Sequence, residues 1–294
     1  IRMKNPVTVA SGTFGYGKEY AELIDVTRLG AITVKGIRLQ AWPGNRLPRH
    51  VEVPGGMVNA IGLQGPGVEG FARDYMPFLR TTGVPVIVNI WGTREEEYAE
   101  VARRLSEVEG VSGLELNISC PNVKEGGHAF GTDPLTVASL VAAVRRATRL
   151  PLMPKLAPNV PDIRLFVRAA QEAGADALAL INTLPAMVID IETRRPVLAN
   201  KVGGLSGLAI HPVAVKLVWE AAQAARVPLL AMGGIVGPEQ AIEFLIAGAS
   251  AVAVGTANFI DPTTPMRVLE GIEAYLRRHG MNAVAALTGS LRTE

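Results

Sequence analysis

One stretch of the chain combines residue types that suit proton transfer to a small polar ligand. Residues 114–118 alternate apolar and polar side chains like a β-strand, and Pro121 ends the strand because proline has no N–H to donate to a ladder. This leaves Cys120, the only cysteine, at the carboxyl end of the strand, followed by the glycine-rich segment 123–131. A lone cysteine is more often a small buried hydrophobe. The short polar residues on either side, Asn117 and Asn122 among them, favour a pocket in which the thiol acts as a general base.

Two lysines stand where predicted strands end. Lys155 lies within the apolar segment 152–156, and Lys35 follows the apolar segment 31–34. An unpaired buried charge is costly, so each lysine must reach solvent or face an anionic partner. We interpret both as ligand-binding residues. Other strand ends add further polar groups, namely Ser11, Asn89, Asn117, Asn182 and Thr183.

Two glycine-containing turns follow the last two predicted strands. Gly233 and Gly234 follow the seventh, and Gly255 with Thr256 follows the eighth. Glycine lets backbone N–H groups approach phosphate oxygens closely, and loops at these positions of a barrel often bind phosphate. These turns therefore predict a phosphate-bearing ligand, although ordinary strand-to-helix turns would show the same glycines.

The elements that must position these residues repeat regularly along the chain. Short apolar strands alternate with amphipathic helices, which predicts an α/β fold of the (β/α)8 TIM-barrel type. The expected strands are 7–10, 31–34, 86–90, 114–118, 152–156, 177–181, 229–232 and 251–254. We expect a single barrel domain over residues 1–294. Extended loops are predicted after strands 2, 4 and 6, over residues 37–66, 121–132 and 184–208.

Two helix starts carry capping signals. Asp133 followed by Pro134 predicts a helix with Asp as N-cap and proline in the first turn. Thr93 stands three residues before Glu96, which predicts a capping box at the start of a charged helix over 93–107.

Composition excludes several classes of protein. Apolar residues make up 48% and charged residues 19% of the 294, which is ample for a large core. A formal charge of +2 with scattered basic pairs argues against nucleic-acid binding. No apolar run approaches the ~20 residues of a membrane helix. One cysteine allows no internal disulfide, which fits a reducing cytoplasm, and no iron–sulfur cluster held by this chain alone. We expect no metal site.

Several motifs closely resemble class 1 dihydroorotate dehydrogenases, specifically the catalytic chain of the NAD-linked class 1B type. The motifs are Asn-Pro-Val-Thr-Val-Ala-Ser-Gly-Thr-Phe-Gly (5–15), Asn-Ala-Ile-Gly-Leu-Gln (59–64), Asn-Ile-Ser-Cys-Pro-Asn-Val-Lys (117–124), Ile-Asn-Thr-Leu (181–184), Gly-Gly-Leu-Ser-Gly (203–207) and Ala-Val-Ala-Val-Gly-Thr-Ala-Asn-Phe (251–259). The resemblance covers nearly the whole chain. Two positions depart from the family pattern: Gly65, where Asn is expected after Gln64, and Trp91 after the third strand.

The resemblance implies an FMN cofactor. Its phosphate would lie on Gly233, Gly234, Gly255 and Thr256, with Gly207 nearby. Lys155 suits the flavin edge that becomes negative on reduction, because a cation stabilises the developing charge. The remaining implied contacts are Ser11, Lys35, Gly36, Asn89, Asn117 and Ile181.

The resemblance also implies the substrate and the reaction, which is oxidation of (S)-dihydroorotate to orotate in de novo pyrimidine (UMP) biosynthesis. Cys120 would remove a proton from C5 while C6 passes a hydride to FMN. Asparagines suit the pyrimidine because each offers donors and acceptors. The implied substrate-binding residues are Lys35, Asn59, Ala60, Ile61, Gly62, Leu63, Asn117, Asn182 and Thr183.

The electrons must then leave the flavin, and the chain has no G-x-G-x-x-G fingerprint for NAD. The resemblance implies a homodimer and a partner subunit that carries FAD and a [2Fe–2S] cluster and passes electrons to NAD+. Three alternatives remain at this stage. They are a fumarate-dependent class 1A enzyme, a dehydrogenase for another dihydropyrimidine, and a phosphate-binding barrel isomerase or lyase without flavin.

Overall fold

The computed structural model describes residues 1–118 and 130–293, and a parallel β-barrel forms its centre. Each barrel strand is a short apolar run rich in β-branched residues, which fit a pleated surface buried on both sides. The barrel strands are β1 (Val7–Val9), β2 (Ile32–Ile37), β5 (Val86–Ile90), β6 (Val111–Asn117), β7 (Leu152–Lys155), β8 (Leu178–Leu180), β13 (Leu229–Ala231) and β14 (Ala251–Val254). The predicted strand positions and the (β/α)8 class are confirmed.

Neighbouring strands of the barrel are parallel and follow the order β1-β14-β13-β8-β7-β6-β5-β2. The two strands at the ends of this order, β1 and β2, are joined by bonds at their edges. The Gly30 N–H donates to the Val7 carbonyl (2.8 Å), and the Thr8 hydroxyl donates to the Ala31 carbonyl (2.7 Å). These two bonds close the barrel, so the carboxyl ends of all its strands meet at one rim.

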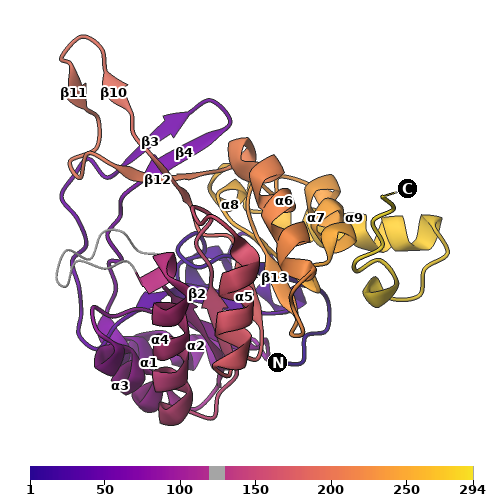
Figure 1. The fold of residues 1–294 in the computed structure, drawn as a ribbon, viewed down its shortest axis with the longest axis horizontal. Helices are drawn as coiled ribbons and strands as arrows, with labels where there is room; N and C mark the ends of the chain where they lie inside the picture. The colour runs from indigo at the N-terminus through magenta and orange to yellow at the C-terminus, as the bar shows by residue number, and fades with distance from the viewer. Residues whose placement is uncertain (119–129, 294) are drawn as a thin grey trace.

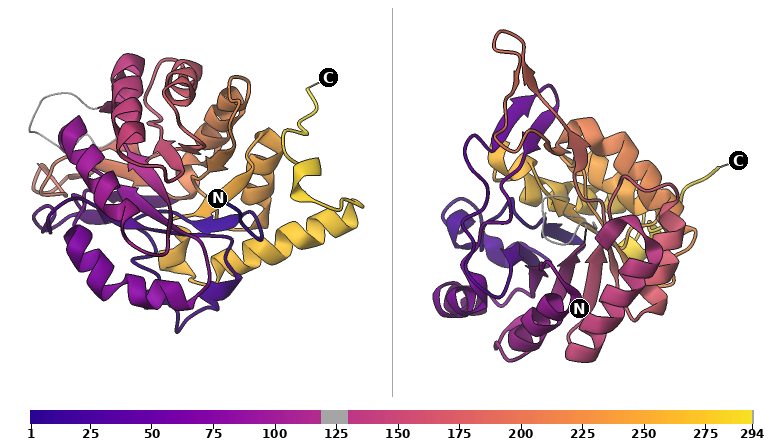
Figure 2. Two further views of the ribbon diagram at one scale, coloured as in Figure 1. Left: turned by 90° about the horizontal axis from the view of Figure 1, so that it is seen from below. Right: turned by 60° about the vertical axis from the view of Figure 1, so that its left-hand side comes forward.

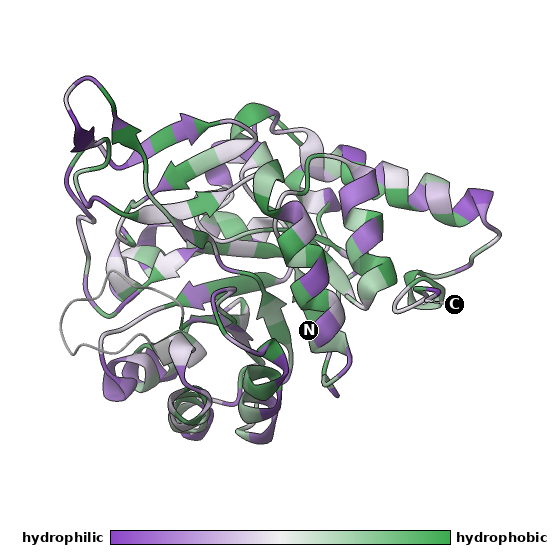
Figure 3. Ribbon diagram, turned by 45° about the horizontal axis from the view of Figure 1, so that its top comes forward, coloured by the Kyte–Doolittle hydropathy of each residue, from purple (hydrophilic) through white to green (hydrophobic). Residues whose placement is uncertain are grey.

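Helices surround the barrel and pack on the outward-facing strand residues (Figures 1 and 2). They are α1 (Gly67–Asp74), α2 (Met76–Thr81), α3 (Glu95–Ser106), α4 (Pro134–Ala147), α5 (Ile163–Glu172), α6 (His211–Ala222), α7 (Pro238–Ala247), α8 (Ala257–Ile260) and α9 (Thr264–Arg278). Short 3-10 helices lie at η1 (Lys18–Tyr20), η2 (Val26–Arg28), η3 (Phe130–Thr132), η4 (Leu208–Ile210) and η5 (Val284–Ala286). Hydrophobic and hydrophilic residues share each long helix in Figure 3, as expected for helices with one face on a core. In the part of the chain that the structure describes, no helix is both long and apolar enough to cross a bilayer.

The two predicted helix starts have different outcomes. Asp133 caps α4 by accepting a 2.9 Å bond from the Thr136 N–H, as predicted. The capping box at Thr93 and Glu96 is wrong. Helix α3 starts at Glu95 after Arg94, which makes no side-chain cap, and Glu97 bonds back to the N–H of Thr93 (2.9 Å). Thr93 stands one residue before the N-cap, and its hydroxyl donates to the Glu97 carboxylate (3.0 Å) instead of accepting from an N–H of the first turn.

The strands divide their side chains between two cores. In β5, Val86 and Val88 join the large apolar layer between barrel and helices, whereas Ile87 joins a smaller cluster of mostly short side chains. Ile87 and its cluster face the barrel interior, because successive residues of a strand face opposite sides. Towards the carboxyl rim the interior becomes polar, with Asn89 and Glu115 opposite one another on β5 and β6.

The two long connections that the sequence predicts after strands 2 and 6 contain strands of their own. The first holds β3 (His50–Val53) and β4 (Gly56–Asn59), and the second holds β9 (Leu184–Ala186), β10 (Ile189–Asp190), β11 (Arg195–Pro196) and β12 (Gly203–Ser206). They combine into one antiparallel sheet, ordered β3-β4-β12-β9, beside the barrel rim (Figure 1). The hairpin β10–β11 extends beyond it (Figures 1 and 2). We call the β3-β4-β12-β9 sheet the rim sheet.

Candidate functional site

A cavity of about 690 Å³ lies at the carboxyl rim of the barrel, bounded on one side by the rim sheet. Its volume falls within the ~300–1,000 Å³ that is usual for small-molecule and cofactor sites. It brings together every site residue that the sequence predicts within the described part of the chain. Those residues are Ser11, Lys35, Gly36, Asn59, Ala60, Ile61, Gly62, Leu63, Asn89, Asn117, Lys155, Ile181, Asn182, Thr183, Gly207, Gly233, Gly234, Gly255 and Thr256.

The predicted catalytic residue, Cys120, lies outside the described residues, as does most of the predicted loop 121–132. Of the residues that line the cavity, Asn117, at the end of β6, and Gly131 stand closest before and after Cys120 in the sequence. The catalytic role of Cys120 therefore stays a prediction.

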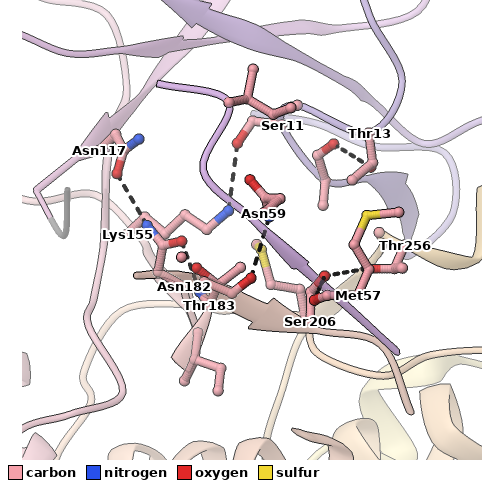
Figure 4. A pocket seen from close by; sticks show the side chains of 18 of the residues that line it. Ser11, Thr13, Met57, Asn59, Asn117, Lys155, Asn182, Thr183, Ser206 and Thr256 are labelled. Atoms are coloured by element: carbon pink, nitrogen blue, oxygen red, sulfur yellow. Dashed lines mark hydrogen bonds between the residues drawn. The ribbon is translucent and has the colours of Figure 1, made fainter. Parts of the chain in front are cut away.

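Glu115 is the centre of a buried polar cluster behind the cavity. Its Oε1 accepts bonds from the Asn89 amide (2.6 Å) and the Ser11 hydroxyl (2.9 Å), and it lies 3.9 Å from the Lys155 ammonium. The Lys155 ammonium also lies 3.4 Å from the Ser11 hydroxyl, as Figure 4 shows. The carboxylate is fully buried and does not line the cavity, whereas its three neighbours do. The predicted anionic partner of Lys155 is thus supplied by the barrel itself.

Strand register explains why the residues of this cluster lie close together. Asn89 is opposite Glu115 on the neighbouring strand, and Asn117 is opposite Lys155. Glu115 and Asn117 are two residues apart, so both point into the barrel. Sequence reasoning missed Glu115, although its place in the alternating pattern of β6 was the signal that could have identified it.

Lys35 has a different environment. Burial in the cavity wall, together with the like charge of Arg49, holds the pKa of Lys35 below its usual value of 10.5. Among the described residues, no carboxylate forms an ion pair with its ammonium group. A partly desolvated cation that lines a cavity in this way suits an anionic group of a ligand.

Asparagine and threonine residues form a hydrogen-bonding wall that includes part of the rim sheet. The Asn182 amide donates to Asn117 Oδ1 (3.1 Å), and Asn182 Oδ1 accepts from the Thr183 N–H (2.8 Å) (Figure 4). Asn59 donates to the Gly204 carbonyl (3.4 Å) in the rim sheet. These amides keep further donor and acceptor positions that a planar polar ring can use.

The segment 60–63 is held in place from outside the cavity. The Asn45 amide donates to the Ala60 carbonyl (2.9 Å), and the Asn45 N–H donates to the Ile61 carbonyl (3.0 Å). Gly62 and Leu63 then adopt positive φ values of 77° and 58°. This local conformation places four consecutive residues in the cavity wall.

The glycine turns form a compact cradle. Gly207, Gly233 and Gly234 have φ values of 100°, 135° and 71°, which side chains rarely tolerate. A Cβ on Gly234 would lie 2.9 Å from the Gly207 carbonyl oxygen, so only glycine fits there. A Cβ on Gly255 would meet only Ala10, at 3.6 Å. The Thr256 hydroxyl donates to Ser206 (2.8 Å), a cavity residue that sequence reasoning did not identify.

These features together fit FMN. The cradle offers close backbone approach for a phosphate, Lys155 supplies a buried cation, and the cavity has the volume of a cofactor site. The residues that would hold the phosphate are the glycines of the cradle with Thr256.

The two departures from the family pattern lie beside the cavity. The N–H and carbonyl of Gly65 pair with those of Trp42, and a Cβ on Gly65 would lie 2.8 Å from the Gly36 carbonyl oxygen. Trp91 is buried, does not line the cavity and packs under the Arg38 guanidinium, 4.7 Å from the ring centroid. Trp42 contacts the same guanidinium at 5.1 Å, so the departures belong to one packed cluster outside the ligand space.

Comparison with known proteins identifies the family. A family model described as dihydroorotate dehydrogenase matches residues 1–276. The chain is 53% identical over 291 residues to the dihydroorotate dehydrogenase B (NAD(+)) catalytic subunit of Pelobacter propionicus, which covers 99% of this chain and 96% of that protein. It is also 53% identical to the subunits of the same name from Geotalea uraniireducens (293 residues, 100% and 96%) and Desulforudis audaxviator (290 residues, 99% and 94%). The chain therefore belongs to the dihydroorotate dehydrogenase family.

Proposed function

We propose that the chain is an FMN-containing catalytic subunit that oxidises (S)-dihydroorotate to orotate in pyrimidine biosynthesis. The family and the names of its full-length relatives support this reaction. The structural observation that carries the proposal is one cavity in which Lys35, an amide wall and a glycine cradle meet, and Lys35 forms no ion pair with a carboxylate in the described part of the chain. Orotate needs the first two, and a flavin phosphate needs the third.

Different residues of the chain would bind the substrate and face the cofactor. Lys35 would bind the substrate carboxylate, and Asn59, Asn117, Asn182 and Thr183 would orient the pyrimidine ring through its amide groups. The redox chemistry is supplied by FMN when it is bound. Lys155, held by Glu115 and Ser11, would keep a positive charge beside the cofactor.

Cys120 completes the proposal as the base that takes a proton from C5 of the substrate. A free thiol has a pKa near ~8.5, so the reaction should be faster on the alkaline side of neutrality. Replacing Cys120 with Ala should leave FMN binding intact and slow flavin reduction roughly 10²-fold or more. Stopped-flow single-turnover measurement with dihydroorotate tests this, and an unchanged rate would remove Cys120 from the mechanism.

The first experiment is a visible spectrum of the purified chain, followed by anaerobic addition of dihydroorotate. We expect yellow protein that bleaches with dihydroorotate and stays yellow with dihydrouracil. Bleaching only with dihydrouracil would assign a different dihydropyrimidine. A colourless protein that takes up no added FMN would refute the flavin assignment itself.

The wider assembly belongs to the same proposal. Electrons would pass to NAD+ through a partner subunit with FAD and a [2Fe–2S] cluster. The relatives' names as NAD(+) enzymes with a catalytic subunit support the link to NAD+ and the existence of a partner. The single cysteine fits a cytoplasmic location.

We also propose a homodimer, with Ile191 (82% exposed) and Ile189 (57%) of the β10–β11 region as candidate contacts. Light scattering of the purified chain measures that state, and a monomer would exclude it.

A further inference from the structure

A buried histidine lies directly behind the glycine cradle. His211, the first residue of α6, is 6% exposed and does not line the cavity. Its Nδ1 lies 2.9 Å from the Gly233 carbonyl oxygen, and its Nε2 lies 2.5 Å from Glu243 Oε2 on α7. The ring also meets the edge of Phe244, at 5.0 Å between centroids. The imidazole is therefore fixed on three sides.

The bond to Gly233 determines where one ring proton must be. A carbonyl oxygen only accepts hydrogen bonds, so Nδ1 must carry a hydrogen and donate it. The second contact leaves this unchanged, because Glu243 can share a proton with Nε2 whichever of the two groups holds it. His211 thus donates to the backbone of the cradle.

Fixing that carbonyl also fixes the next N–H. The peptide unit is planar and trans, so the N–H of Gly234 points opposite to the carbonyl of Gly233. Since that carbonyl points to His211, the Gly234 N–H points away from the histidine. Gly234 lines the cavity, and among the described residues its N–H donates to no backbone carbonyl.

The packing leaves little alternative to this orientation. A Cβ on Gly234 would lie 2.7 Å from the His211 Cβ and 2.9 Å from the Gly207 carbonyl oxygen. The turn is therefore pressed against the histidine on one side and the neighbouring turn on the other, with the cavity as its open side.

We propose that His211 is a positioning residue for phosphate recognition, acting by holding the Gly233–Gly234 peptide with its N–H directed at the phosphate of the flavin nucleotide. This inference rests on the proposed function and assigns a role to a side chain that does not touch the cofactor. Glu243 steadies the ring from the opposite side and is 57% exposed at its side chain.

Three substitutions separate this role from simple packing. His211→Asn places an amide N–H where Nδ1–H stands, so it can still donate to Gly233. His211→Gln places its amide near the former Nε2 position and cannot, and His211→Ala removes both contacts. The full-length, flavin-free protein is titrated with FMN and separately with riboflavin, which lacks the phosphate, by following flavin fluorescence.

We expect the wild type to prefer FMN strongly over riboflavin. In His211→Ala and His211→Gln the affinity for FMN should fall about tenfold, the order expected for one well-placed hydrogen bond, while riboflavin affinity changes less than twofold. His211→Asn should retain most of the FMN preference. Riboflavin binding also reports that each variant is folded, and if the Ala variant does not fold, the Asn and Gln variants decide the question.

Other results would overturn the inference. Equal losses for FMN and riboflavin in the Ala and Gln variants would reduce His211 to a packing residue. An Asn variant as weak as the Gln variant would show that the bond to Gly233 is not what matters. A wild type without any preference for FMN would instead refute the phosphate assignment of the proposed function, a result distinct from failure of His211 alone.

Discussion

Glu115 illustrates how a single residue outside a cavity can set the arrangement of residues within it. One carboxylate oxygen serves two hydrogen-bond donors and lies near a lysine, and all three partners line the cavity. Its second oxygen, Oε2, is buried and has no hydrogen-bond partner among the described residues. Removing the carboxylate would take a buried negative charge away from a position 3.9 Å from the Lys155 ammonium, which is more costly than losing a neutral bond.

Substitution of Glu115 should therefore depend on which group replaces it. Glu115→Ala should lower the free energy of unfolding by about 3–5 kcal/mol, the range for breaking a buried ion pair. Glu115→Gln removes the same charge but keeps an acceptor oxygen for the Asn89 amide and the Ser11 hydroxyl, so it should cost less than Ala by about the worth of those hydrogen bonds. Urea unfolding of the full-length protein measures both. Glu109→Ala is the matched control, because Glu109 pairs with Arg80 at the surface with its side chain 84% exposed and should change stability little. Similar losses at positions 115 and 109 would contradict the role of Glu115.

Lys35 should make ligand binding depend on pH. Its lowered pKa means that the ammonium loses its proton at a lower pH than an ordinary lysine. As pH rises through that pKa, the positive charge that attracts a carboxylate disappears, so the Kd for orotate should increase. At lower pH, where Lys35 is charged, the Kd should be constant with respect to this group.

Orotate titrations of the FMN-loaded protein from neutral to alkaline pH test this, using the flavin spectrum as the signal. Lys35→Met should bind orotate weakly at neutral pH, and its deficit relative to wild type should shrink as pH rises. The exposed Lys18 supplies a control, since Lys18→Met should retain the wild-type profile. A constant ratio between wild type and Lys35→Met at every pH would exclude Lys35 as the titrating group.

The sequence identified single site residues correctly where their place at the end of one strand was enough to mark them. A polar or charged residue at the end of an apolar strand is unusual and indicates a ligand site, which is how Lys35, Asn89 and Lys155 were identified. His211 was not, because its partners Gly233 and Glu243 come from other elements and nothing near it in the sequence indicates them.

At the level of secondary-structure elements, the rim sheet brings two distant segments of the chain together beside the cavity. It joins β4 from the first long connection to β12 from the second, with Gly204 opposite Asn59. Both connections therefore form one wall of the cavity, although they leave the barrel after different strands. The strand Gly203–Ser206 has glycine at two of its four positions, so its side chains show no clear alternation of apolar and polar residues. Its pairing partner lies about 145 residues away, and the local sequence does not indicate such a pairing. The barrel strands were predictable because each is a compact apolar run.

A small change in the rim sheet should affect the substrate more than the cofactor. A Cβ on Gly204 would lie 1.9 Å from the Thr183 hydroxyl and 2.6 Å from its Cβ, so Thr183 or β12 must move. Gly204→Ala should raise the KM for dihydroorotate roughly tenfold while the protein keeps its FMN, because Gly233, Gly234 and Gly255 of the cradle lie on other turns and only Gly207 follows β12. Gly237→Ala is the control, since Gly237 has extended backbone and lies outside the cavity. If the Gly204 variant lost its flavin while its KM for dihydroorotate stayed unchanged, the rim sheet would not act mainly on the substrate.

For the whole molecule, the proposed electron path requires a second protein. The purified chain should oxidise dihydroorotate with an artificial acceptor but reduce NAD+ poorly, because it has no dinucleotide-binding fingerprint. Adding a partner that carries FAD and a [2Fe–2S] cluster should restore NAD+ reduction. Steady-state assays with and without the partner measure this. Robust turnover of the isolated chain with fumarate would instead place it with the fumarate-dependent enzymes.

The pairing of β1 with β14 has a consequence for synthesis on the ribosome. Val7 pairs with Val252, so the first strand of the barrel waits for a partner made about 245 residues later. At ~5–20 residues per second the wait is on the order of 10–50 s, during which one edge of β1 stays open. Part of the proposed cofactor site is also completed only then, because Gly255 and Thr256 follow β14 directly. The nascent chain therefore cannot gain stability from a bound flavin until nearly all of it has left the ribosome.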